Sequence, residues 1–80
     1  MTIGVPKEIF TNEKRIGLSP QACKLLTGKG FNVVVEEGAG EGAKFLDSDF
    51  IDAGAKIGSM KDAFNADIVL KVTMILIIIH

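Results

Sequence analysis

Three basic side chains are the residues of this sequence best suited to binding chemistry: Lys7, Arg15 and Lys71. The first two belong to residues 6–19, a stretch without clear periodicity between a predicted strand and a predicted helix. Connections of that length are uncommon in a compact domain unless they have a function or are disordered. The apolar residues interspersed here favour an ordered loop. We therefore expect Arg15 and Lys7 near the carboxyl end of the first strand, where open α/β sheets bind ligands.

Each of these residues also has a purely structural interpretation. Arg15 can pair with Glu13 and so hold the loop together. Lys71 lies in a predicted buried strand, where an unpartnered ammonium is costly, so it should reach the carboxyl edge of the sheet or pair with an acid. At that edge it can contact an anion beside Arg15, or it can be a strand-end lysine that extends to water. The sequence leaves these alternatives open.

The composition excludes several classes of protein. A net charge of −1 and the lack of Trp and Tyr give no support for nucleic-acid binding. The single cysteine, Cys23, excludes an intramolecular disulfide and a cysteine zinc site, and we expect it to be buried on a helix. The single histidine, His80, cannot form a metal cluster. We therefore expect no metal and no nucleic acid, and no signal peptide is visible.

The first half of the chain predicts a β-α-β unit. Residues 2–5 are typical of a strand that Pro6 ends. Ser19 and Pro20 predict a helix start, because Ser caps a helix and Pro fits its first position. That helix is expected to end at Gly28 and Gly30. The three valines within residues 31–36 then favour a strand buried on both faces, parallel to the first and joined to it by a right-handed crossover.

Shorter elements follow. After a glycine-rich turn over residues 37–43, Asp47 or Ser48 is expected to cap a short helix that Gly54 closes. Residues 55–57 predict an edge strand. Ser59 and Asp62 have the spacing of a capping box for a helix that runs to residue 65, and residues 67–72 predict a second buried strand. The fold class is therefore α/β, a small, open, mostly parallel Rossmann-like (doubly wound) sheet with flanking helices and an incomplete domain.

The last stretch differs from the rest of the chain. Residues 74–79 are uniformly apolar, but the run is too short to span a bilayer, and we expect the 80-residue chain itself to be soluble. Exposed, such a run is an aggregation hazard. It can be a strand extension buried by a partner protein, or the end of a truncated or misread coding sequence; we favour the second.

One glycine motif nearly fits a dinucleotide fingerprint: GAGEGA, residues 38–43. Its surroundings disagree with that function, because acidic residues crowd the turn, the helical signal starts only near Asp47, and the acid expected about 20 residues on has no clear counterpart. We therefore interpret these glycines as a tight turn and expect no cofactor to be bound by this segment alone.

Several blocks nevertheless resemble a known family when taken together and in order. They are residues 3–10 (IGVPKEIF), 12–15 (NEKR), 18–20 (LSP), 30–36 (GFNVVVE), 38–41 (GAGE) and 53–55 (AGA). The chain is similar, over residues 2–72, to the start of the family that joins alanine dehydrogenase to the proton-translocating NAD(P) transhydrogenase. The resemblance makes residues 1–72 a partial N-terminal domain of that family and residues 73–80 an apolar tail that does not match.

The resemblance also implies a function. Residues 10–15, 18–20 and 30–35 lean towards the transhydrogenase, which transfers a hydride between NAD(H) and NADP(H), coupled to proton translocation. NAD and NADP would be substrates of the parent enzyme and would be held mainly by other domains. Its partners would be the membrane and NADP(H)-binding parts of the same enzyme, in a homodimer. The parent would be associated with the bacterial inner membrane at its cytoplasmic face, or with the mitochondrial inner membrane at its matrix face.

The family also assigns roles to particular positions. In alanine dehydrogenase, the arginine that matches Arg15 holds the substrate carboxylate, and a second contact comes from the later lysine of a Lys-Val-Lys-Glu-Pro run. Lys71 and Val72 match the beginning of that run, but Thr73 replaces its second lysine. We therefore expect the isolated chain to be inactive.

Two other functions stay open. The chain can be the N-terminal fragment of an alanine dehydrogenase, which deaminates alanine oxidatively to pyruvate with NAD. It can also be a stand-alone, non-enzymatic interaction module that acts through its apolar end.

Overall fold

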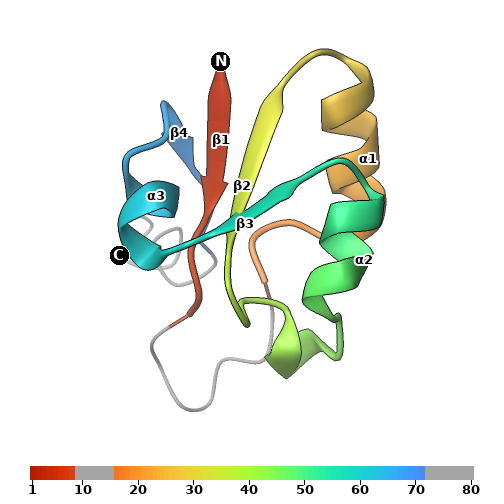
Figure 1. Cartoon of the computed structure of the whole chain (residues 1–80), viewed down its shortest axis with the longest axis vertical. Helices are drawn as coiled ribbons and strands as arrows, with labels where there is room; N and C mark the ends of the chain where they lie inside the picture. Colours follow the sequence, from red (N-terminus) through yellow and green to blue (C-terminus); the bar gives the residue numbers. More distant parts are fainter. Residues whose placement is uncertain (9–15, 72–80) are drawn as a thin grey trace, which may run out of the picture.

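The fold is built on an open parallel sheet. A computed structural model describes residues 1–8 and 16–71. In these residues four strands form one sheet in the order β3-β2-β1-β4, and every neighbouring pair is parallel (Figure 1). The strands are β1 (Thr2–Val5), β2 (Asn32–Glu36), β3 (Lys56–Gly58) and β4 (Ile68–Val69). The helices are α1 (Pro20–Gly28), α2 (Asp47–Asp52) and α3 (Met60–Phe64), with a 3₁₀ turn, η1 (Glu41–Ala43). The predicted α/β class and parallel β1–β2 pair are confirmed.

Helices cover both faces of the sheet. Cys23 of α1 and Phe50 of α2 are fully buried in one core with the alternate strand residues Ile3, Val33 and Val35. On the other face α3 lies against β1 and β2. Figure 1 shows α1 and α2 together on one side and α3 on the other. This is the doubly wound arrangement that the sequence predicts, and Cys23 is buried on a helix as expected.

At one point a helix touches the sheet without a side chain between them. A Cβ added to Gly4 of β1 would lie 1.8 Å from the carbonyl oxygen of Ala63 in α3. No atom can occupy that space, so position 4 needs glycine for close approach. The contact sets how closely α3 sits on the centre of the sheet.

Local capping explains α1 and α3. The hydroxyl of Ser19 accepts a hydrogen bond from the amide of Ala22 at 3.2 Å, and Pro20 occupies the first helical position. Past the end of α1, Gly30 has φ +94, which a glycine adopts without strain. In α3, Ser59 accepts from the amide of Asp62, whose carboxylate accepts from the amide of Ser59 at 3.0 Å. Both predicted helix starts are confirmed.

The start of α2 corrects one prediction. The cap residue is Leu46, with Asp49 accepting from the Leu46 amide at 2.8 Å, rather than Asp47 or Ser48. Asp47 is the first helical residue, and its carboxylate accepts from the Gly38 amide at 3.0 Å. The carboxylate that local sequence would assign to a cap is thus used to hold the preceding glycine turn.

Two strands also differ from their predictions. Residues 67–72 were expected to form a buried strand, but β4 has two residues, lies at the edge of the sheet, and leaves Ile68 41 % exposed. On β2, Val33 and Val35 are buried but Val34 is only half-buried, so burial is complete on one face alone. The edge strand expected at 55–57 is present as β3.

The apolar stretch over residues 74–79 and the tail as a whole lie outside the described residues. Among the residues that are described, no helix is long and apolar enough to cross a membrane.

Candidate functional site

The carboxyl ends of the parallel strands meet at one edge of the sheet, the lower edge in Figure 1. β1 and β2 are aligned with Val5 opposite Val35, and β4 is aligned with Val69 opposite Gly4. The residues that leave the sheet there are Lys7 after β1, Glu36 and Glu37 at the end of β2, and Lys71 after β4. Open α/β sheets bind ligands at this kind of edge. The structure therefore brings two of the three predicted basic residues to one edge.

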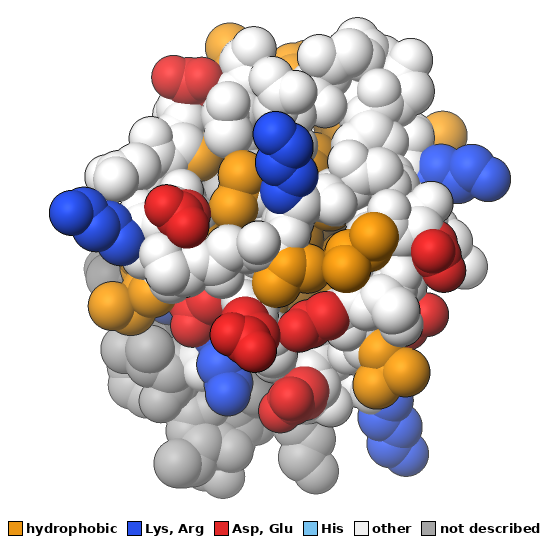
Figure 2. Space-filling view, in the orientation of Figure 1, with side chains coloured by type: hydrophobic (Ala, Val, Ile, Leu, Met, Phe, Trp, Pro, Cys, Tyr) orange, Lys and Arg blue, Asp and Glu red, His pale blue; other side chains and the backbone are white. Residues whose placement is uncertain are grey.

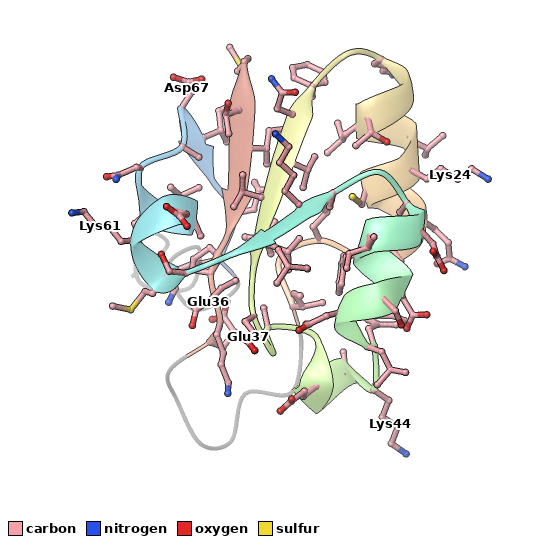
Figure 3. All side chains as sticks on the ribbon, in the orientation of Figure 1. Lys24, Glu36, Glu37, Lys44, Lys61 and Asp67 are labelled. Carbon is pink, nitrogen blue, oxygen red and sulfur yellow. The ribbon has the colours of Figure 1, made fainter. Side chains whose placement is uncertain are left out.

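Lys7 is exposed, but its main chain is fixed. Its amide donates a hydrogen bond to Oε1 of Glu36 at 3.0 Å. In Figure 3 Glu36 and Glu37 lie at the lower end of β2, on the carboxyl side of the sheet. The lysine backbone is thus tied to the neighbouring strand while the side chain remains in solvent.

Lys71 is the only buried charged residue in the described part of the chain, with 6 % of its surface exposed. Its Nζ lies 5.7 Å from the centroid of the Phe64 ring in α3, within the range of a cation–π contact. Lys71 was expected to reach the carboxyl edge of the sheet or to pair with an acid; it follows β4 at that edge, and the contact seen for its ammonium is with an aromatic ring. Little of the side chain is therefore in contact with water.

Arg15 lies outside the described residues, and so does its possible partner Glu13. The residues just after Arg15 are described. A Cβ added to Gly17 would lie 2.3 Å from the carbonyl oxygen of Leu70, so the chain returns from the loop directly against the residue that precedes Lys71. Leu18 then enters the core. Gly17 and Leu70 therefore lie side by side at this edge, next to Lys71.

The glycine turn has a structural explanation. It follows β2, and the Ala39 amide donates to the carbonyl of Glu36 at 2.9 Å to close it. The Gly38 amide is bonded to Asp47, and a Cβ on Gly40 would lie 2.8 Å from the Phe50 ring. These glycines are needed for backbone conformation and close packing, as expected of a tight turn.

Acidic groups dominate the surface near this turn. Figure 2 shows acidic side chains gathered on the lower part of the face in view. Glu36, Glu37 and Glu41 lie in or beside the turn. Negative charge at this density opposes the approach of a pyrophosphate, although solvent weakens the effect. An anion at this edge is therefore better placed beside the basic residues than over the glycines.

Two titrating groups are shifted by their surroundings. Hydrogen bonds from the Ser59 backbone and hydroxyl lower the pKa of Asp62, whereas burial raises the pKa of the Cys23 thiol. Neither group lies among the basic residues of the edge. In the described part of the chain no three His, Cys, Asp or Glu residues are grouped so that they could hold a metal ion.

The sequence analysis did not identify two residues of this edge. Glu36 was predicted as part of a strand and as one of the acids that crowd the glycine turn, but its hydrogen bond with the Lys7 amide was not anticipated. Phe64 was not singled out, although its ring is the partner of Lys71. The one feature of the sequence that could have indicated a role for Glu36 is its position, as an acid at the carboxyl end of a predicted strand. Nothing in the spacing of Phe64 and Lys71 predicts their contact.

The fold and these features define a class of protein. The family model described as "Alanine dehydrogenase/PNT, N-terminal domain" matches residues 4–77. The chain belongs to this family. The resemblance seen in the sequence is thereby confirmed, while the boundary at residue 72 stays a prediction.

The relatives of this chain include both transhydrogenases and alanine dehydrogenases. The chain is 43 % identical over 72 residues to the NAD(P) transhydrogenase subunit alpha of Haemophilus influenzae, covering 90 % of this chain and 14 % of the relative. It is 48 % identical over 73 residues to the alanine dehydrogenase of Staphylococcus epidermidis, covering 90 % of this chain and 20 % of that relative.

Solved structures agree with the fold. An L-alanine dehydrogenase superposes with a TM-score of 0.87 at 47 % identity, and a transhydrogenase from Sinorhizobium meliloti superposes with a TM-score of 0.84 at 41 % identity. Each match covers 89 % of this chain and 20 % of the solved chain. This chain therefore spans a fifth or less of the length of the relatives it matches, and the two branches are not distinguished.

Proposed function

We propose that this chain is part of an NAD(H)-dependent oxidoreductase, in which the carboxyl edge of the sheet supplies basic side chains to a site for an anionic group of the substrate. The observation that carries the proposal is the meeting of two segments at this edge: Gly17 lies against Leu70, and Lys71 follows at once. In this proposal Arg15, Lys71 and Lys7 act together on one anion.

The chemistry of these residues suits that role. An arginine can bind a carboxylate or phosphate through two parallel hydrogen bonds, which fixes its orientation. A lysine adds a point charge with three donors. Because Lys71 is buried, its attraction for an anion is screened less than that of exposed Lys7. We assign the main binding role to Arg15 and Lys71 and an accessory role to Lys7.

The first candidate for the whole protein is the transhydrogenase, which passes a hydride between NAD(H) and NADP(H). Residues 10–15, 18–20 and 30–35 support it, because these blocks resemble transhydrogenases more than alanine dehydrogenases. In this proposal NAD and NADP are substrates held by other parts of the enzyme. Those parts include an NADP(H)-binding component and a membrane component that moves protons, in a homodimer at the inner membrane.

The second candidate is alanine dehydrogenase. Its support is the slightly higher identity of this chain to alanine dehydrogenases, at 48 % and 47 %, than to transhydrogenases, at 43 % and 41 %. In that enzyme Arg15 would hold the carboxylate of alanine or pyruvate. The same basic edge serves both candidates, so the geometry alone favours neither.

The deciding experiment begins with the genomic sequence downstream of codon 72. The full-length product is then assayed for hydride transfer between NADH and an NADP⁺ analogue and for alanine oxidation with NAD⁺. A second nucleotide domain followed by several apolar spans, with the first activity, supports the transhydrogenase. A single nucleotide domain with the second activity supports alanine dehydrogenase. If the folded full-length protein shows neither activity, the proposal is overturned.

The role of Arg15 is tested in the same full-length enzyme. Arg15→Ala removes a charge-assisted contact, which is worth roughly 1.5–3 kcal/mol, so the KM for the anionic substrate should rise by about tenfold or more. Lys24→Ala, at an exposed position on α1, is the matched control and should leave the KM unchanged. An unchanged KM in Arg15→Ala would remove this residue from the site.

A further inference from the structure

Glu36 holds the chain where it leaves the sheet. Its Oε1 accepts a hydrogen bond from the Lys7 amide at 3.0 Å. Because Val5 lies opposite Val35, Glu36 stands beside Pro6 in the parallel pair. Pro6 has no amide hydrogen to donate. Lys7 therefore supplies the first free amide after β1, and the Glu36 carboxylate reaches across from β2 to take it.

The position of Glu36 makes this contact informative. In β-α-β units that bind dinucleotides, an acid near the carboxyl end of the second strand bonds to a ribose hydroxyl. Glu36 ends the second strand of such a unit, β1-α1-β2. Here, however, an oxygen of this acid bonds to the protein's own backbone. The glycine turn also follows β2 instead of β1.

We propose that Glu36 is a positioning residue, which fixes the direction of the segment that leaves β1 and thereby places Lys7 at the anion site. The inference rests on the proposed function. The carboxylate is well suited to it, because a hydrogen bond from an amide to a charged oxygen is stronger than one to a neutral acceptor.

The neighbouring residue provides a matched control. Glu37 carries the same charge one position further on, its side chain is exposed, and its amide donates to the carbonyl oxygen of Gly58 at 3.0 Å. Substitution of Glu37 changes the local charge as much as substitution of Glu36 but leaves the bond to Lys7 in place. A difference between the two positions therefore reports the bond and not the loss of one negative charge.

The first test is amide hydrogen exchange in the 80-residue chain. Glu36→Met keeps the side-chain length without an acceptor, and the Lys7 amide should exchange at least about threefold faster, as expected for a lost hydrogen bond. Glu36→Gln keeps a carbonyl acceptor and should stay near wild type, as should Glu37→Met. The Leu70 amide donates to the Gly4 carbonyl at 2.9 Å, so its exchange rate reports whether the sheet is intact. The Lys7 rate in each variant is divided by the Leu70 rate in the same variant. An unchanged relative rate at Lys7 in Glu36→Met would overturn the proposal.

The second test uses the full-length enzyme. Glu36→Met should raise the KM for the anionic substrate about threefold or more, with kcat changed less than about twofold. Glu36→Gln, which keeps an acceptor, should have a KM near that of wild type. If Arg15→Ala raises the KM and Glu36→Met does not, the positioning role is wrong and the proposed function stands. If Glu36→Met raises the KM and Arg15→Ala does not, the positioning role stands and the proposed role of Arg15 is wrong. If neither variant changes the KM, both proposals are wrong.

Discussion

Lys71 shows how a single residue can be poorly suited to stability and well suited to binding. Only 6 % of its surface is exposed, its Nζ lies 5.7 Å from the centroid of the Phe64 ring, and a cation–π contact is worth only about 0.5–2 kcal/mol. Burying a charge usually costs more than such a contact returns. A residue kept in this state is a reasonable candidate for a site that attracts anions.

This reasoning gives a prediction for Lys71→Met. Because an apolar side chain of similar length avoids the desolvation cost, the free energy of unfolding should stay within about 1 kcal/mol of wild type or rise. In the full-length enzyme the same change should raise the KM for the anionic substrate. Urea denaturation and steady-state kinetics measure the two effects. Lys61→Met, at an exposed position on α3, is the control and should alter neither. A large loss of stability would mean that Lys71 is structural.

Asp62 gives a prediction about pH. Its pKa is lowered from the ordinary value of 3.8, first by hydrogen bonds from Ser59. A group whose pKa is lower in the folded state stabilises the fold above its unfolded pKa, and that contribution is lost as the pH falls through the folded pKa. Stability should therefore fall as the pH drops from about 5 towards 2, and less steeply in Asp62→Asn.

The carboxyl resonance of Asp62, followed by NMR as the pH is lowered, measures the shift directly. Ser59→Ala should bring the pKa of Asp62 back towards its ordinary value, because the hydroxyl bond is removed. Ser48→Ala, on α2, is the control. If the pKa of Asp62 is equally low without the Ser59 hydroxyl, the backbone bond alone accounts for the shift.

At the scale of elements, the contact between α3 and β1 depends on a missing side chain. A Cβ at Gly4 would overlap the carbonyl oxygen of Ala63, which is backbone and cannot move aside alone. Gly4→Ala should lower the free energy of unfolding by about 1–3 kcal/mol or more, as for other overpacked cores. Gly28→Ala is the control, because a Cβ there meets nothing within 4 Å and alanine favours a helix. Denaturant melts should show a lower free energy of unfolding for Gly4→Ala and a higher one for Gly28→Ala.

The elements that could be predicted are those with local causes. Ser19 and Pro20 start α1, and Ser59 with Asp62 starts α3, because each cap is formed within one turn of chain. The prediction failed at α2, where Asp47 bonds to Gly38 across the turn instead of capping its own helix. Competition between a local and a more distant partner cannot be seen in residue types.

For the site, too, the sequence predicts features with local causes but not contacts between residues far apart in the chain. The carboxyl edge and the basic residues on it follow from strand direction, which a β-α-β pattern implies. The bond between Glu36 and Lys7 joins residues 29 positions apart, and it depends on the register of β1 against β2. The burial of β4 was overestimated for the same reason, because exposure depends on which neighbours cover a strand and its composition does not reveal them.

For the molecule as a whole, the single thiol of Cys23 reports unfolding. It is fully buried, and burial raises its pKa, so the reactive thiolate is disfavoured in the folded state. Labelling with a thiol reagent should be slow under native conditions and rise to the rate of a free cysteine when the fold is lost in urea. If native Cys23 reacts as fast as a free thiol, α1 is not packed on the sheet in solution.

The N-terminal strand sits in the middle of the sheet, yet its second neighbour comes from far along the chain. The Thr2 amide donates to Asp67 at 2.8 Å across 65 positions, and β1 then pairs with β4. A ribosome must therefore release nearly all of the described chain before the first strand has both its neighbours. Until then β1 offers an unpaired edge to any passing polypeptide, so synthesis exposes this domain to misassembly for longer than its small size suggests.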